Sequence, residues 1–324
     1  MPSSSRHCLR VSIPVLAATA VLQLGGCAAS GEMSADTAPV LQAISFLDDS
    51  LITLPLSDST RVRYEQQLAE AKAAYDRAPT DVDSIIWYAR RLGYLGQFRE
   101  AIEVYTGGIA LHPDNPWLYR HRGHRFISVR EVDHAIEDLE RAAILIQGKP
   151  DEVEPDGQPN ARNQPIGTLH SNIYYHLGLA YYLKGEYARA VELYRKELAE
   201  AQNDDRRVST AHWLYMSLRR MGQEPEAAAA VAPFTRDMNV IENQTYHRLV
   251  LMYKGELPPD SVLVVPASGE MSVTDATAAY GVGNWHVYNG RRDEGVAIFR
   301  RILAGGQWAA FGYIAAESDV AYMK

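Results

Sequence analysis

The residues best suited to chemistry form a short cluster, "HRGHR", in which two histidines and two arginines fall within residues 121–125. Two histidines on one helix face bind zinc when they are four residues apart with a glutamate between them as general base. Here His121 and His124 are three residues apart, no glutamate intervenes, and the adjacent arginines would repel a cation. The sequence therefore predicts neither a metal ion nor a cofactor, and it indicates one surface of an ordinary helix.

A second cluster of residues that could do chemistry is acidic. Glu152, Glu154 and Asp156 alternate ahead of Gly157, as carboxylates do in helix–loop–helix calcium sites. The bidentate glutamate that closes such a site is replaced here by Asn163, so a solvated acidic loop is the better interpretation. The sequence also lacks a G-x-S-x-G nucleophile motif and a phosphate-binding glycine loop. We therefore expect no catalytic residues. The alternative is an enzyme with an acid–base pair of His124 or His212 and an acidic loop residue.

These clusters lie within an internal repeat. Four similar segments align on a small residue, at Ala101, Ala135, Ala190 and Gly295, with 34 residues between the first two. The next two intervals are 55 and 105 residues. A fifth match at Ala227 divides the last of these into 37 and 68 residues, and 68 is twice 34. A fixed period of this length is typical of a repeat architecture in which each unit packs on the next.

The period and its residues resemble the tetratricopeptide repeat, a helix–turn–helix unit of about 34 residues. The best copy is "YYHLGLAYYLKGEYARAVELYRKEL", residues 174–198. Its diagnostic positions are Tyr174, Leu177, Gly178 and Tyr181 on the first helix, Gly185 at the turn, and Tyr187, Ala190 and Tyr194 on the second helix. The resemblance covers residues 82–324 and implies an all-α protein, an α-solenoid whose first helices line a concave groove.

The remaining segments are interpreted around this array. Residues 41–81 are expected to form an N-terminal capping helix region, and residues 82–253 the repeat array. Residues 148–168, rich in proline and glycine, form a loop insertion of the kind that often lies at the binding surface. Prolines forbid a regular helix in an irregular linker at 254–275, and residues 276–324 form a last repeat and a capping helix.

The N-terminus has the layout of a bacterial lipoprotein signal. Arg6 and Arg10 precede an apolar run at residues 11–22 that is too short to cross a bilayer, so residues 1–26 are interpreted as a signal peptide. The "LGGC" that follows resembles a lipobox, which implies that Cys27 is lipidated and begins the mature chain. Ala28 then favours an outer-membrane, periplasm-facing location over the inner membrane, with residues 27–40 as a flexible tether. Cleavage elsewhere, giving a secreted protein, is the alternative.

Composition narrows the classes of partner. The chain has 32 basic and 40 acidic side chains, a net charge of -8, which argues against nucleic acid as a partner. Its two cysteines are Cys8 in the signal and Cys27, so the mature chain is expected to contain no disulfide.

The repeat frame predicts which residues line the groove. These positions carry mainly arginine and aromatic side chains: Arg90, Tyr94, Trp117, Arg120, His124, Tyr175, Tyr182, His212 and Arg219. Arginine forks bind carboxylates and aromatic rings supply rigid contact area. The Lys and Asn positions of the carboxylate-clamp variant of the family are not reproduced here, so a chaperone tail is not implied.

We therefore predict an interaction scaffold, a lipid-anchored adaptor of the cell envelope whose groove binds a peptide or another carboxylate-bearing partner. Arg90, Arg120, Arg219 and Arg220 also allow a second hypothesis, a module that binds an anionic glycan or lipid. The sequence makes no prediction about self-association.

Overall fold

The computed structural model describes residues 40–54, 56–263 and 271–323. The chain divides into two units, Met1–Ala38 and Pro39–Lys324, and the second contains all of the described residues. The signal peptide at 1–26, the lipidation site Cys27 and the tether up to residue 39 lie outside them. No helix within the described part of the chain is long and apolar enough to cross a membrane.

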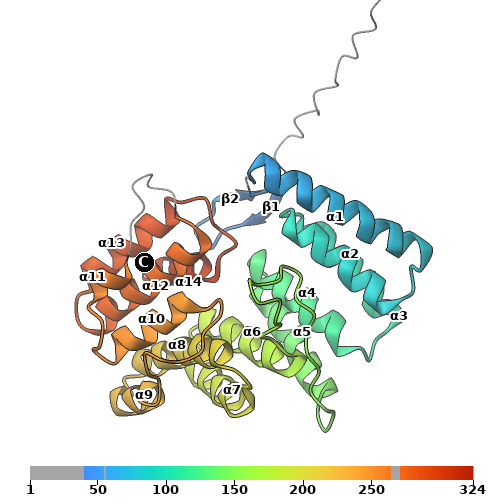
Figure 1. The fold of residues 1–324 in the computed structure, drawn as a ribbon. Helices are drawn as coiled ribbons and strands as arrows, with labels where there is room; N and C mark the ends of the chain where they lie inside the picture. The colour runs from blue at the N-terminus through green and yellow to red at the C-terminus, as the bar shows by residue number, and fades with distance from the viewer. Residues whose placement is uncertain (1–39, 55, 264–270, 324) are drawn as a thin grey trace, which may run out of the picture. The chain divides into compact units, whose positions relative to one another are not determined.

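The described part of the chain is all-α apart from one small hairpin (Figure 1). It contains fourteen helices: α1 Asp58–Arg77, α2 Val82–Tyr94, α3 Phe98–Leu111, α4 Pro116–Ser128, α5 Val132–Leu145, α6 Leu169–Leu183, α7 Tyr187–Glu200, α8 Asp204–Arg220, α9 Glu224–Val231, α10 Gln244–Tyr253, α11 Pro259–Val262, α12 Val273–Tyr288, α13 Arg292–Leu303 and α14 Phe311–Tyr322. The hairpin strands, β1 Leu41–Ile44 and β2 Ser50–Ile52, are antiparallel.

The helices pack in consecutive pairs, which confirms the predicted α-solenoid. The pairs are α2 with α3, α4 with α5, α6 with α7, α8 with α9, and α12 with α13. In four pairs a glycine with a φ of 74° to 79° makes the turn, at Gly96, Gly185, Gly222 and Gly290. Glycine adopts this left-handed conformation at no steric cost. In the pair α4–α5 the same position is Arg130, with a φ of 66°.

The two helices of a pair approach closely because one residue at the contact is small. A β-carbon at Gly178 of α6 would lie 2.7 Å from the Tyr194 ring of α7, and Ala190 beside it is fully buried. The same arrangement recurs in α4 and α5, where a β-carbon at Gly123 would lie 2.7 Å from Leu139. The small residues that mark the repeat in the sequence are therefore the contact points of the helix pairs.

The N-terminal region contains a hairpin in addition to the expected helix. Gln42 of β1 is buried, and its Oε1 accepts hydrogen bonds from the backbone N–H groups of Phe98, at 2.8 Å, and Arg99, at 3.1 Å. These are donors of the first turn of α3, whose N-cap residue Gln97 makes no side-chain cap. The hairpin therefore satisfies groups that the helix itself leaves without a partner.

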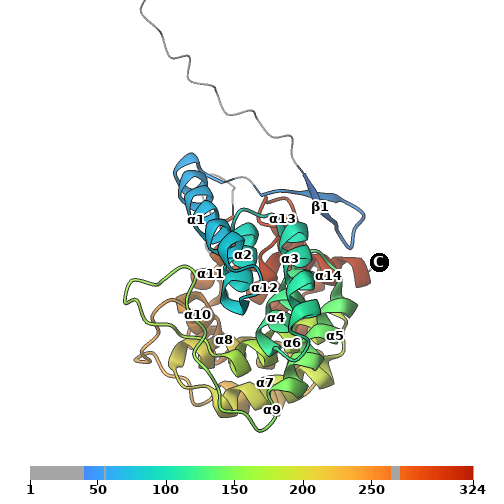
Figure 2. The same cartoon turned by 90° about the vertical axis from the view of Figure 1, so that its right-hand side faces the viewer.

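The same hairpin joins the first helix pairs to the last helices. β1 and β2 lie between these two groups of helices in Figure 1, and Figure 2 shows β1 on the same side of the helices as α14. The Trp308 indole donates to the carbonyl of Ile52 at 2.8 Å, and its ring packs edge-on against Phe98 at 5.4 Å. The Phe46 N–H donates to Glu317 of α14 at 2.7 Å. Contacts between the two ends therefore close the array, which an open solenoid would lack.

Candidate functional site: the concave faces of α2 and α4

The nine residues predicted to line the groove lie on the first helices of four pairs, α2, α4, α6 and α8. On α6 and α8, three of the predicted residues are buried: Tyr175 is 5% exposed, Tyr182 3% and His212 0%. The Tyr175 hydroxyl accepts from the Trp213 indole at 2.8 Å, the Tyr182 hydroxyl lies 2.6 Å from that of Tyr280, and His212 Nδ1 lies 2.9 Å from the Tyr253 hydroxyl. At these positions the expected open groove is filled by helices α10, α12 and α14.

A fourth predicted residue, Arg219, lies apart from the rest at the end of α8. Its guanidinium packs over the Tyr288 ring at 4.6 Å and donates to Asn289 Oδ1 at 3.0 Å. Its neighbour Arg220 is bound to Asp319 and to Asn284. These two arginines are therefore engaged with α12 and α14, and they do not join Arg90 and Arg120 in one surface.

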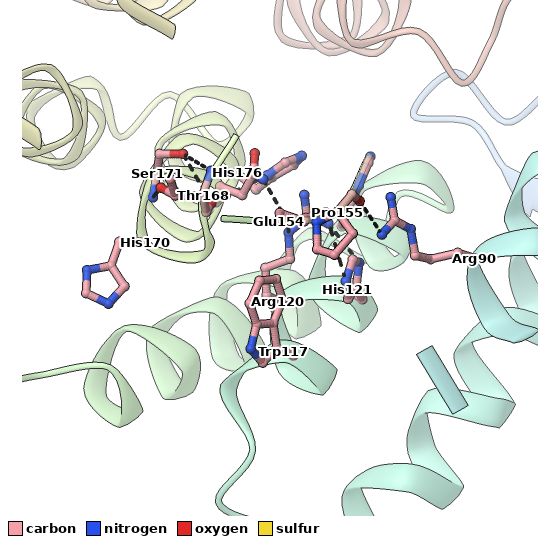
Figure 3. Close-up of polar contacts among 12 residues, drawn as sticks. Arg90, Trp117, Arg120, His121, Glu154, Pro155, Thr168, His170, Ser171 and His176 are labelled. Carbon is pink, nitrogen blue, oxygen red and sulfur yellow. Dashed lines mark hydrogen bonds and ion pairs between the residues drawn. The ribbon is translucent and has the colours of Figure 1, made fainter. Parts of the chain in front are cut away.

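The other five predicted residues come together. Arg90 and Tyr94 of α2 and Trp117, Arg120 and His124 of α4 surround a segment of the insertion that we call the strap, residues 153–157. Figure 3 shows Arg90, Trp117 and Arg120 gathered around Glu154 and Pro155 of the strap.

The strap is bound to both helices. Arg90 Nη1 donates to the carbonyl of Pro155 at 2.9 Å, and Arg91 Nη1 donates to that of Gly157 at 3.0 Å. Gly157 is in close contact with α2, since a β-carbon there would lie 1.8 Å from the Tyr94 hydroxyl oxygen. Main-chain groups of the insertion therefore use the donors that a groove would offer to a ligand.

Glu154 carries the buried side chain of the strap and is 7% exposed. Its carboxylate lies 3.0 Å from Arg120 Nε, whose N–H is not aimed at the oxygen, and it accepts a hydrogen bond from Asn172 of α6 at 2.7 Å. His121 Nε2 lies 4.0 Å away. The carboxylate is thus held by one ion pair and one well-directed hydrogen bond.

Two cavities lie on either side of the strap. The first, about 120 Å³, which we call the arginine cavity, is lined by Arg90, Tyr94, Arg120, His121, His124 and Arg125, together with Tyr105 and Glu154. The second, about 170 Å³, which we call the tryptophan cavity, is lined by Trp87, Trp117, Ile86 and the strap residues Val153 and Pro155. Arg90 and His121 border both cavities.

The arginine cavity has more positive than negative charge. Among the described residues that line it there are three guanidinium groups, of Arg90, Arg120 and Arg125, and one carboxylate, of Glu154. Burial lowers the pKa of Arg120, and it lowers that of Arg125 to about 10 because desolvation disfavours the charged form. Both remain protonated at neutral pH. Unpaired buried charge is costly, so this site favours an additional anion.

The histidines of the cavity are neutral. Burial, with the nearby charges of Arg120 and Arg125, holds the pKa values of His121 and His124 well below their ordinary value. Arg120 Nη1 donates to His121 Nδ1 at 2.9 Å. The proton of neutral His121 is therefore assigned to Nε2, a buried donor without a hydrogen-bond partner. The cavity offers this N–H to an acceptor oxygen.

The other chemistries considered from the sequence have no matching geometry in the described residues. No group of three His, Cys, Asp or Glu side chains there could hold a metal ion. His124 contacts Arg125, His176 and Phe311, and His212 contacts Tyr253, so neither is paired with a carboxylate among the residues that the structure describes.

Sequence reasoning did not assign Arg125, His121 and Glu154 to the groove. Arg125 and His121 are not among the groove positions of the repeat frame, but both line the arginine cavity. The signal for Glu154 was the position of the insertion, which was expected at the binding surface.

Comparisons with known proteins bear on the fold. No protein-family model and no curated protein matches the chain. Among solved structures, it is similar to YrrB, described as a tetratricopeptide repeat protein with an unusual peptide-binding site, at 15% identity and a TM-score of 0.41, over 72% of this chain and 91% of that one. It is also similar to a tetratricopeptide repeat protein from Parabacteroides merdae, at 13% identity and a TM-score of 0.46, over 80% and 93% of the two chains.

A third similar structure contains repeats of a putative kinesin light chain from Podospora anserina, at 18% identity and a TM-score of 0.42, over 70% of this chain and 94% of that one. At these values, the fold assignment depends on the helix pairs and turn positions described above. The chain is an all-α scaffold of tetratricopeptide-type helix pairs.

Proposed function

We propose that this protein is a lipid-anchored adaptor of the bacterial cell envelope that binds a peptide or other carboxylate-bearing partner at the concave faces of α2 and α4. The observation that carries the proposal is the arginine cavity, where three guanidinium groups, of Arg90, Arg120 and Arg125, line the wall and the described lining residues supply one carboxylate, that of Glu154. A partner carboxylate would neutralise a buried charge and accept charge-assisted hydrogen bonds.

The proposed anchor is the lipidated Cys27, which supports an outer-membrane, periplasm-facing location. Twelve residues, 28–39, separate Cys27 from Val40, where the described structure begins. A fully extended tether of this length spans at most about 45 Å, so the groove would act close to the membrane surface. A site confined in this way has a raised effective concentration for a membrane partner.

The first experiment measures peptide binding to the purified chain by fluorescence anisotropy. The probes are labelled, amidated octapeptides of alternating Glu and Ala, with matched Gln and Ala peptides as the neutral comparison. We expect binding of the Glu peptides only, weakened by salt. Arg125→Ala should weaken it about tenfold or more, since a charge-assisted hydrogen bond contributes about 1.5–3 kcal/mol.

The matched control is Arg195→Ala, which removes the same charge from an exposed position on α7. Equal binding of Glu and Gln peptides, or equal losses in the two variants, would overturn the carboxylate site. No measurable affinity for the Glu peptides, together with salt-dependent retention of the chain on immobilised polygalacturonate, would favour the anionic-glycan alternative.

The anchor is tested separately in cells by incorporation of a labelled fatty acid. We expect label in the wild-type chain and in its membrane fraction, and neither in Cys27→Ser. Label or membrane retention that persists in Cys27→Ser would overturn the lipid anchor.

A further inference from the structure

The strap occupies the groove in the manner of a bound peptide. It contributes a side-chain carboxylate to Arg120 and two main-chain carbonyls to Arg90 and Arg91. It is extended at its start, where the Glu154 N–H donates to the carbonyl of Gly167 at 2.9 Å and Val153 forms a bridge with Thr168. Peptides that bind in extended form use the same combination of main-chain hydrogen bonds and side-chain pockets.

The strap also places apolar groups in the neighbouring cavity. Val153 and Pro155, on either side of Glu154, border the tryptophan cavity with Trp87 and Trp117. Val153 is 60% exposed, so this apolar side chain covers little of the aromatic surface available to it. The strap therefore covers the aromatic side chains of the tryptophan cavity only in part. A partner with an apolar residue, a glutamate and a proline in succession can cover more of them.

The strap leaves the site incompletely satisfied in charge as well. It supplies one carboxylate to a cavity with three guanidinium groups, and His121 Nε2 has no hydrogen-bond partner among the residues that the structure describes. A ligand that supplies the same carboxylate and a second anionic group would bind the same cavity with better charge balance. These observations indicate a site that is occupied, but not filled, by the chain itself.

We propose that the strap is an internal ligand and that it defines the partner: an extended acidic segment with an apolar residue, a glutamate and a proline in succession, which displaces Glu154 from Arg120. This inference rests on the proposed function, because it takes the concave faces of α2 and α4 as the partner site. The strap competes from within the chain, so the affinity for a partner falls in proportion to the fraction of molecules in which the site is open.

Two substitutions loosen the strap through independent contacts. Glu154→Gln removes the charge that pairs with Arg120 while keeping the side-chain shape. Gly157→Ala places a β-carbon against Tyr94 and Arg90 Nη2, so this end of the strap must move away from α2. The matched control is Glu152→Gln, which makes the same chemical change in the same loop at an exposed residue without an ion pair among the described residues. Thermal melting establishes that each variant is folded.

The probe is a labelled, amidated octapeptide with the sequence of residues 151–158, DEVEPDGQ, compared with the same peptide carrying Gln in place of the central Glu. We expect the Glu peptide to bind Glu154→Gln and Gly157→Ala about tenfold more tightly than the wild type or Glu152→Gln. The Gln peptide should bind none of them measurably. In the wild type, saturating Glu peptide should raise the amide hydrogen exchange of residues 153–157 as the strap is released.

If the two loosened variants bind the Glu peptide no more tightly than the wild type, and strap exchange does not rise, the strap is a structural loop and the inference is overturned. The alternating Glu/Ala peptides separate this result from failure of the proposed function. If these peptides still bind in an Arg125-dependent way, the proposed function stands alone, whereas loss of all acidic-peptide binding overturns both.

Discussion

Arg130, in the turn between α4 and α5, is ion-paired with Glu317 of α14, with Nη2 2.7 Å from Oε2. The two side chains are 3% and 1% exposed, although 187 residues separate them in the sequence. Glu317 also accepts the Phe46 N–H, and Arg130 also donates to the carbonyl of Trp308. This pair therefore joins the second repeat, the N-terminal hairpin and the C-terminal helix at one buried point.

We expect Glu317→Ala to lower the free energy of unfolding by about 3–5 kcal/mol, because it leaves the buried Arg130 charge without a partner. The measurement is urea denaturation. Asp114→Ala is the control, since Asp114 pairs with Arg141 at the surface and is 81% exposed. That variant should change stability by less than about 0.5 kcal/mol. Similar losses in the two variants would show that the buried pair of Arg130 and Glu317 contributes no more to stability than a surface ion pair.

Arg130 also permits a test of backbone strain. Its φ of 66° is in the region that favours glycine, yet an arginine occupies it and makes the buried pair. Arg130→Gly and Arg130→Ala both remove the pair, but only alanine keeps the strain. We therefore expect Arg130→Gly to be more stable than Arg130→Ala by about 1 kcal/mol in the same denaturation experiment.

The reverse order is expected at Lys184, a half-buried turn position with a φ of -85°. There Lys184→Ala should be the more stable variant, because glycine adds only flexibility of the unfolded chain. If alanine is preferred at both positions, the conformation of Arg130 is not strained in solution.

The helix pairs could be predicted from the sequence because the information is local. Small residues recur at positions such as Gly178 and Ala190, and the structure shows these at the contact between α6 and α7. Turn glycines such as Gly185 likewise have the positive φ that ends one helix and starts the next. A period of 34 residues repeats these local requirements often enough to be read from one sequence.

The positions of the groove residues could be predicted only in part, because exposure depends on contacts between distant segments. The repeat frame places Tyr182 and His212 on the groove side of α6 and α8, but Tyr280 of α12 and Tyr253 of α10 pack against them. No local sequence pattern predicts that later helices will cover earlier ones. The place of Glu154 beside Arg120 depends in the same way on how a loop folds back onto a helix.

Two glycines within helices, Gly123 and Gly107, should respond in opposite ways to substitution by alanine. At Gly123 the added β-carbon would lie 2.7 Å from Leu139, so we expect Gly123→Ala to destabilise the protein by about 1–3 kcal/mol. At Gly107, exposed within α3, no atom lies within 4 Å of the added carbon. Gly107→Ala should therefore stabilise it by about 0.5–1 kcal/mol. Differential scanning calorimetry checks both, and a loss at Gly107 would contradict the helix packing described.

The stability of the protein should depend on pH through its buried histidines, of which His212 gives the clearest case. Burial lowers the pKa of His212 to about 3. Between this value and the ordinary value of about 6.5, the unfolded chain binds a proton at this position and the folded chain does not. The contribution to stability is therefore complete above about pH 6.5 and is lost as the pH falls toward 3, by up to about 1.4 kcal/mol per pH unit.

We expect the free energy of unfolding of His212→Asn to depend less steeply on pH over this range than that of the wild type, whatever its value at neutral pH. The difference in slope corresponds to the uptake of up to one fewer proton on unfolding. The measurement is the free energy of unfolding from urea titrations at several pH values between 4 and 7. Arg195→Asn, at an exposed position of α7, removes a group that does not titrate in this range and should retain the wild-type slope. An unchanged slope in His212→Asn would show that His212 is protonated in the folded chain, which requires water to reach the interface of α8 and α10.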